Sequence, residues 1–125
     1  MVHKMKKLPA VFYRSAAGNE LVRDWLNGRE LDEHDRRAIG RDVAKAEYGW
    51  PIGMPTCELL GDGLYVIRSN LPNNRITRII FSIEASNMVL LHGFVKKSTE
   101  GIKTPQHEID VAADRRRELL KRRPR

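Results

Sequence analysis

The stretch 64–97, LYVIRSNLPNNRITRIIFSIEASNMVLLHGFVKK, decides the fold. It contains three runs rich in Ile, Val, Leu and aromatic residues, at 64–70, 75–83 and 87–95. The segments 72–74 and 85–87 separate these runs, and turn-forming residues at such short spacing are typical of hairpins. The stretch therefore predicts an antiparallel meander of three strands.

Helical patterns surround the meander, and a short strand is predicted over 9–13. Asn19 and Asp32 are predicted to cap two amphipathic helices, which end near Gly28 and Gly49. Thr104-Pro105 predicts the start of a last helix, with threonine as cap and proline at the first helical position. The result is an α+β domain of order strand, two helices, three strands and helix, with an antiparallel sheet and both N-terminal helices on one face. The predicted apolar helix positions are Leu21, Val22, Trp25 and Leu26, then Ile39, Val43 and Ala46, then Ile109, Ala112, Ala113 and Leu120.

The chain has the size of one domain, predicted to span 1–125 with basic tails at 1–8 and about 121–125. Apolar residues make up 41% of it and charged residues 31%, enough apolar material for a small core. The net charge of +7 is concentrated in 1–7, 68–103 and 115–125. Such surfaces attract phosphate groups, although a basic surface that only solubilises the protein is an open alternative.

Several classes of protein are excluded. No apolar run approaches the ~20 residues of a membrane span, and 1–7 lack the apolar core of a signal peptide, so a cytoplasmic protein with no membrane contact is expected. Cys57 is the only cysteine, which excludes an intramolecular disulfide and a cysteine zinc cage. The four histidines show no zinc-ligand spacing, and neither a metal nor a cofactor is expected.

Alternation along the predicted strands sorts the side chains onto two sheet faces. One face is apolar and is expected to lie under the two N-terminal helices. The other is expected to be open and basic, and like charges on adjacent strands are tolerated there when they are solvated or bind an anion. For each arginine alone, a solvent-facing or salt-bridged role stays an alternative, and for His92 a structural role. The predicted apolar set is Tyr65, Ile67, Ile79, Phe81, Val89, Leu91 and Val95, and the basic face carries Arg68, Arg78, Met88, Leu90, His92, Phe94 and Lys96.

Longer strings in the sequence carry a family resemblance. The strings at 58–68, ELLGDGLYVIR, and 78–81, RIIF, together with the element order, resemble the RelE/HigB toxin superfamily. The string at 90–97, LLHGFVKK, followed by Lys103-Thr104-Pro105 and Glu108-Ile109, is similar to its phage-derived Gp49-like branch of HigB toxins. The resemblance spans roughly residues 9–120. The chain departs from the expected pattern at 98–102, where it is longer.

This resemblance implies the toxin of a type II toxin–antitoxin system. Such toxins are ribosome-dependent endoribonucleases that cleave mRNA and are held inactive, in a hetero-oligomer, by a helix-turn-helix antitoxin of the HigA kind. Some relatives inhibit DNA gyrase instead. The alternatives are therefore a gyrase inhibitor or other non-nuclease binder, and an inactive phage-derived module that binds nucleic acid.

The expected reaction is attack of an RNA 2′-hydroxyl on the adjacent phosphate, which requires no metal and no cofactor. Arg68 and Arg78 are the candidates for stabilising the charge that develops on the phosphoryl oxygens. His92 and Lys96 are the candidates for proton transfer, and the sequence does not distinguish the acid from the base. Lys96 has a phosphate clamp as its alternative role. RNA contacts are assigned to Lys97 and Lys103, and Phe94 is a candidate either for base stacking or for a residue that covers the core.

Overall fold

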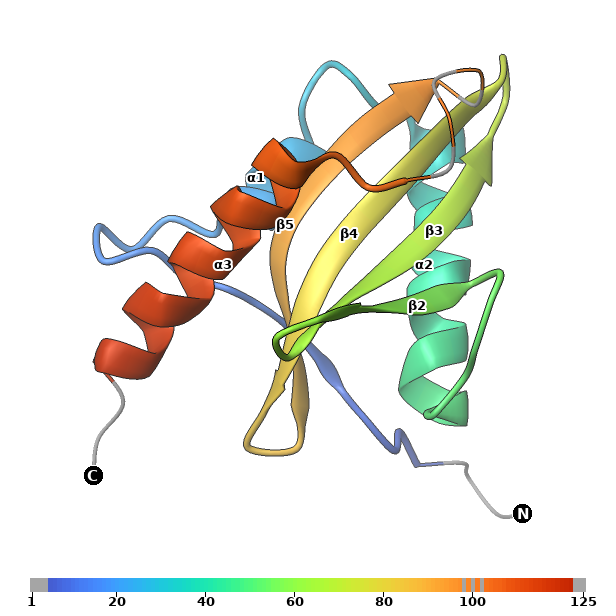
Figure 1. Cartoon of the computed structure of the whole chain (residues 1–125). Helices are drawn as coiled ribbons and strands as arrows, with labels where there is room; N and C mark the ends of the chain where they lie inside the picture. Colours follow the sequence, from blue (N-terminus) through green and yellow to red (C-terminus); the bar gives the residue numbers. More distant parts are fainter. Residues whose placement is uncertain (1–4, 98, 100, 102, 123–125) are drawn as a thin grey trace.

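The computed structural model describes residues 5–97, 99, 101 and 103–122. A five-stranded sheet with strand order β1-β5-β4-β3-β2 lies between α2 on one side and α3 on the other (Figure 1). This arrangement confirms the predicted α+β class. The elements are β1 (Ala10–Phe12), α1 (Leu21–Leu26), α2 (Glu33–Gly49), β2 (Cys57–Gly61), β3 (Leu64–Leu71), β4 (Arg75–Glu84), β5 (Asn87–Lys97) and α3 (Gln106–Lys121).

The sheet is mixed, whereas a wholly antiparallel sheet was predicted. The three predicted strands of the meander are present as β3, β4 and β5, and they pair antiparallel. β1 joins the free edge of β5 in parallel, with Val11 opposite Val89. Parallel pairing needs a long crossover connection, and the chain from α1 to β4 provides it.

The strand β2 at the opposite edge was not predicted. It pairs antiparallel with β3 through a tight turn at Asp62-Gly63, where both residues have positive φ angles, of 52° and 78°. Cys57 begins β2 opposite Ile67 and is buried. Burial raises the pKa of the Cys57 thiol to about 11.

Of the three predicted helix caps, Asn19, Asp32 and Thr104, the structure confirms one. The Asp32 side chain accepts a hydrogen bond from the Asp35 backbone, and the Asp35 side chain accepts one from the Asp32 backbone. This capping box confirms the predicted cap. The cap position of α1 is occupied by Glu20, whereas Asn19 was predicted. Pro105 takes the cap position of α3, one residue later than predicted, and no side chain caps this helix.

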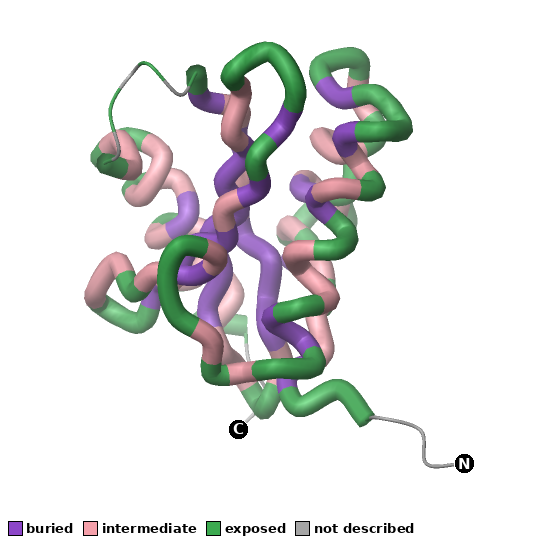
Figure 2. The backbone as a smooth tube through the Cα atoms, turned by 90° about the vertical axis from the view of Figure 1, so that its right-hand side faces the viewer, coloured by how far each residue is buried: buried purple, intermediate pink, exposed green. Residues whose placement is uncertain are grey.

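The main core lies between the sheet and the helices α1 and α2. Phe81 at its centre is inaccessible to solvent, and the Trp50 ring meets it edge-on at 5.7 Å between centroids. Gly93 on β5 is covered by the Trp25 ring of α1, so closely that a Cβ at position 93 would lie 2.3 Å from a ring carbon. In Figure 2, buried residues follow the central strands and exposed residues follow the turns and the outer helix surfaces.

The two ends of α2 are joined to the sheet by polar contacts. At the start, the buried Asp35 carboxylate receives two hydrogen bonds of 3.0 Å from Arg75 on β4. The Arg75 guanidinium holds the pKa of Asp35 below its ordinary value of 3.8. At the end, Glu47 accepts from the backbone of Ala10 at 2.8 Å and pairs with Lys6 at 3.0 Å.

A β-bulge in β5 changes the predicted faces. Ile80 pairs with His92, but the next residue, Phe81, pairs with Leu90, so Leu91 is an extra residue in the ladder. Alternation is reset at this point, and the first half of β5 has the opposite orientation from the prediction. Met88 and Leu90 pack in the main core, under α1 and α2, while Val89 and Leu91 pack in a second cluster with Ala112 of α3. The assignment of these four residues from alternation is wrong, and the positions beyond the bulge keep theirs.

Residues assigned to basic tails take part in the fold. Leu8 is buried at 4% exposure, and the backbones of Lys7 and Leu8 both donate to the Glu47 carbonyl. At the other end, Arg122 pairs with Glu118, which accepts from the Tyr13 hydroxyl at 2.8 Å. The predicted tail beyond this point, 123–125, lies outside the described residues.

Candidate active site

Three of the predicted site residues form a row across the sheet. Arg68 on β3 is the direct partner of Arg78 on β4, and Arg78 is the direct partner of Phe94 on β5. All three side chains therefore project from the same face, the one on which α3 lies. Directly opposed like charges are unfavourable, so the Arg68–Arg78 pair needs compensation by an anion.

A carboxylate from the edge strand supplies part of that compensation. Glu58 on β2 accepts a hydrogen bond of 2.6 Å from the Arg68 guanidinium. Arg78 donates to the Thr104 hydroxyl at 3.3 Å. Burial, reinforced by the charge of Arg68, lowers the pKa of Arg78, while Glu58 acts in the opposite direction. Two guanidinium groups on adjacent strands are groups that can bind a phosphate.

His92 lies on the same face, two residues before Phe94 along β5 and opposite Ile80 of β4. Its ring stacks on Phe94 with centroids 5.8 Å apart. Its Nε2 lies 2.8 Å from the Glu108 carboxylate of α3, and its Nδ1 lies 3.4 Å from a guanidinium nitrogen of Arg115. Both ring nitrogens of His92 thus face a charged group of α3.

The lysines of the predicted site are separated. Lys96 shares the face of Arg78 and is buried at 6% exposure, with its ammonium group donating to the backbone carbonyl of Lys103. The Lys103 side chain is exposed beside it. Lys97 pairs with Arg75, whose side chain reaches α2, so by alternation Lys97 belongs to the opposite face. The structure does not bring Lys97 together with the other six residues.

The predicted basic face is partly covered instead of open. Arg78 is 1% exposed and Phe94 is 8% exposed, because the segment before α3 and the helix itself pack against them. Figure 1 shows this segment crossing in front of the sheet before α3 begins. The sequence offered no signal for this, since the position of a final helix relative to a sheet depends on tertiary packing.

Three charged residues at the site were not singled out from the sequence. Glu58 and Glu108 stood inside the strings that carry the resemblance, but neither received a role. Arg115 was considered only as part of the basic stretch 115–125, yet it donates at 2.7 Å to the Leu91 carbonyl and also faces His92. An acid or arginine in a charged run has no periodicity that distinguishes an internal role from a solvated one.

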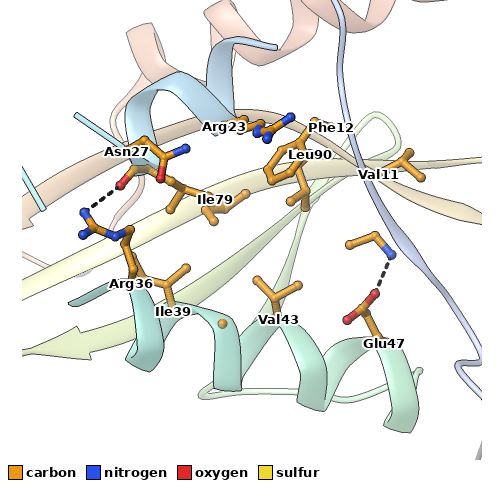
Figure 3. A pocket seen from close by; sticks show the side chains of 13 residues that line it. Val11, Phe12, Arg23, Asn27, Arg36, Ile39, Val43, Glu47, Ile79 and Leu90 are labelled. Atoms are coloured by element: carbon orange, nitrogen blue, oxygen red, sulfur yellow. Dashed lines mark hydrogen bonds between the residues drawn. The ribbon is translucent and has the colours of Figure 1, made fainter. Parts of the chain in front are cut away.

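A hollow with a volume of about 390 Å³ lies away from this face, between α1, α2 and β1. Figure 3 shows Ile39, Val43 and Leu90 lining it, with Arg36 toward one end and Glu47 toward the other. Arg36 donates to the Leu31 carbonyl, and Glu47 accepts from Ala10, so these charges serve the fold. The hollow is mostly apolar and lacks the cationic row of the α3 face.

One acidic group among the described residues has the spacing of metal ligands. The ligand atoms of Asp32, His34 and Asp35 lie within 4.8 Å of one another. The Asp35 carboxylate receives both guanidinium hydrogen bonds of Arg75, and the Asp32 carboxylate caps α2. These existing partners account for the acidic pair.

The α+β fold, with three helices and a five-stranded mixed sheet, is that of a small RelE-like domain. The chain belongs to the phage-derived Gp49-like family (DUF891), whose model matches residues 24–117. The matched region runs from α1 into α3 and includes each residue of the candidate site. This family is a member of the RelE/HigB-like toxin superfamily and is associated with toxins of toxin–antitoxin systems, which implies an antitoxin partner.

No curated protein matches the sequence. Across the described parts of the chain, none of the helices combines the length and the apolar character that a bilayer span requires.

Proposed function

We propose that this protein is the toxin of a type II toxin–antitoxin system and acts as a ribosome-dependent endoribonuclease on mRNA. The observation that carries the proposal is the row of Arg68, Arg78 and Phe94 across three neighbouring strands. Two fixed guanidinium groups match the charge and the geometry of a phosphate, and an adjacent aromatic ring matches a nucleobase.

The reaction is attack of a 2′-hydroxyl on the adjacent phosphorus, which releases the 5′-oxygen of the next nucleotide and leaves a 2′,3′-cyclic phosphate. Arg68 and Arg78 stabilise the negative charge that builds on the non-bridging oxygens. Glu58 accepts a hydrogen bond from the Arg68 guanidinium and so fixes its position beside Arg78. The chemistry needs one proton removed from the 2′-hydroxyl and one delivered to the leaving oxygen, and His92 and Lys96 are the candidates.

Access to the site requires movement of the segment that precedes α3. Arg78 is 1% exposed and contacts Thr104, and the Lys96 ammonium contacts the Lys103 carbonyl. An RNA phosphate reaches these groups when it replaces the Thr104 hydroxyl and the Lys103 carbonyl as their partner. Lys103, with its exposed side chain, then lies where the backbone of the RNA enters.

One alternative is a nucleic-acid-binding module whose basic tails supply the affinity. Arg115 donates to the Leu91 carbonyl and Arg116 to the Glu84 carboxylate, while Arg122 forms an ion pair with Glu118 at the surface. This use of the α3 arginines supports a site on the sheet over a site on the tail. The partner expected for the toxin is a helix-turn-helix antitoxin of the HigA kind, in a hetero-oligomer.

The proposal is tested by brief induced expression followed by mapping of mRNA 5′ ends, with and without active translation. We expect translation-dependent cuts from the parent protein, and loss of cuts and of growth inhibition from Arg68→Met and Arg78→Met. Arg37→Met is the matched control, since Arg37 is an exposed arginine of α2 that pairs with Glu33 on the surface.

Full toxicity in both site variants, at expression levels equal to the parent, would reject the assignment. Altered DNA supercoiling with intact mRNA would select the gyrase alternative, and absence of toxicity in the parent protein would select the inactive module.

A further inference from the structure

The β-bulge at Leu91 determines which residues of β5 reach the candidate site. Without the extra residue, strict alternation would place Met88 and Leu90 on the same sheet face as the site residues, as the sequence predicts. With it, the side chains of Leu91 and His92 both lie on the α3 face. A bulge also frees a backbone group from the ladder, and such groups need another partner.

Arg115 supplies that partner from α3. One nitrogen of its guanidinium lies 2.7 Å from the Leu91 carbonyl oxygen and 3.4 Å from Nδ1 of His92. Burial lowers the pKa of Arg115, yet the group remains a cation far above neutral pH. Arg115 is partly buried, and a cation withdrawn from water needs acceptors, which the Leu91 carbonyl and Nδ1 of His92 provide.

The helix places two charged residues on opposite sides of one imidazole. Glu108 and Arg115 are seven residues apart, which corresponds to two helical turns and the same helix face. Glu108 lies 2.8 Å from Nε2 of His92, while Arg115 faces Nδ1. The ring is therefore held between an acceptor and a donor.

This arrangement selects one tautomer of His92. A guanidinium group only donates hydrogen bonds, so the Nδ1 atom that faces it must accept and cannot carry a proton. A carboxylate only accepts, so the Nε2 atom that faces Glu108 must carry the proton. The neutral Nε2–H form satisfies both partners.

We propose that Arg115 is a positioning residue for the reaction: it binds the bulge carbonyl and Nδ1 of His92, and with Glu108 it holds the imidazole in the Nε2–H form. This inference rests on the proposed function for its catalytic consequence, but its structural content is measurable in the free protein. A residue that merely attaches α3 to the sheet would not determine the tautomer of His92.

The test uses NMR of the full-length protein with ¹⁵N-labelled histidine, with His92 assigned by its absence in His92→Asn. In the parent protein we expect one protonated ring nitrogen, Nε2, and one unprotonated nitrogen, Nδ1. In Arg115→Met we expect the two ring-nitrogen signals to move toward each other, as the tautomers exchange, and translation-dependent cleavage to fall about tenfold to a hundredfold.

Arg116→Met is the matched control. Arg116 also joins α3 to the sheet, through Glu84 at 2.9 Å and the Asp62 carbonyl at 3.2 Å, and neither of these hydrogen bonds involves His92. This variant removes the same charge and a comparable attachment. We expect its His92 signals and its cut pattern to match those of the parent.

The outcomes separate the inference from the proposed function. A parent protein with Nδ1 protonated, or an Arg115→Met variant whose His92 signals and cleavage equal those of Arg116→Met, would overturn the inference. If the tautomer depends on Arg115 but the parent protein cuts no mRNA, the structural assignment of Arg115 is supported and the reaction under Proposed function is rejected.

Discussion

The two faces of the sheet are built from the same strands and serve different ends. Under α1 and α2, the face is apolar and closes a continuous core around Ile79 and Phe81. Under α3, only part of the face is apolar, with Val66 and Ile80 packed near Ala112, and the rest carries the Arg68–Arg78 pair. Substitutions on the first face should therefore act on stability, and substitutions on the second face should act on chemistry.

Among substitutions on the first face, Phe81→Ala is expected to lower the free energy of unfolding most. Phe81 is fully buried and stacks on Tyr65 at 5.3 Å, so truncation leaves a cavity that the surrounding strands cannot close. We expect a loss of about 3–5 kcal/mol in the free energy of unfolding, measured by urea denaturation. Leu59→Ala is the control, because Leu59 is 63% exposed, and a similar loss there would contradict the contrast.

Two glycines test how closely the first face is packed. A methyl group at Gly93 would meet the Trp25 ring at 2.3 Å, so we expect Gly93→Ala to cost about 2 kcal/mol. Gly40 lies within α2 with nothing within 4 Å of an added Cβ, so we expect Gly40→Ala to stabilise by about 0.5–1 kcal/mol. Thermal denaturation measures the change in stability of each variant. A change in the same direction for both variants would disprove the packing argument.

The Asp35–Arg75 pair gives the first face a dependence on pH. Arg75 holds the pKa of Asp35 below 3.8, so the pair stabilises the fold above that pH and loses its effect as the pH falls through the lower, folded-state pKa. We expect Asp35→Asn to cost about 1–2 kcal/mol at neutral pH and to differ less from the parent in acid.

The measurement for this pair is urea denaturation at a series of pH values. Glu33→Gln is the control, because Glu33 is 71% exposed and pairs with Arg37 only at the surface. A constant difference between Asp35→Asn and the parent down to strongly acidic pH would refute the linkage.

The smallest expected effect on stability is that of Arg78→Met. Burial and the charge of Arg68 disfavour the Arg78 cation, so an apolar side chain of similar length should change the free energy of unfolding by less than about 1 kcal/mol. The same variant is expected to abolish cleavage. A loss as large as that of Phe81→Ala would make Arg78 a structural residue.

Local patterns predicted most of the elements, because strands β3 to β5 and helix α2 have strong alternation, turns and caps of their own. β2 was missed because five residues after a proline-rich segment carry too little pattern. The faces were correct along β3 and β4 and beyond residue 91 of β5. They were wrong from Met88 to Leu91, since a bulge is a property of the pairing between two strands and is not visible in the alternation of one strand.

The candidate site was predictable to the same extent. Alternation placed Arg68, Arg78 and Phe94 on one face, and the register aligned them in a row. The partners Glu58, Glu108 and Arg115 come from other elements, and their positions follow from how β2 and α3 dock. A sequence pattern describes which side of an element a residue occupies, and the docking of a distant element is decided by the whole core.

The single cysteine provides a built-in probe of local opening. Because Cys57 is buried at the start of an edge strand and its thiol resists ionisation near neutral pH, a thiol-specific reagent reacts with it slowly while β2 stays paired. The labelling rate of the unmodified chain therefore measures how often this edge of the sheet detaches, without any engineered reporter.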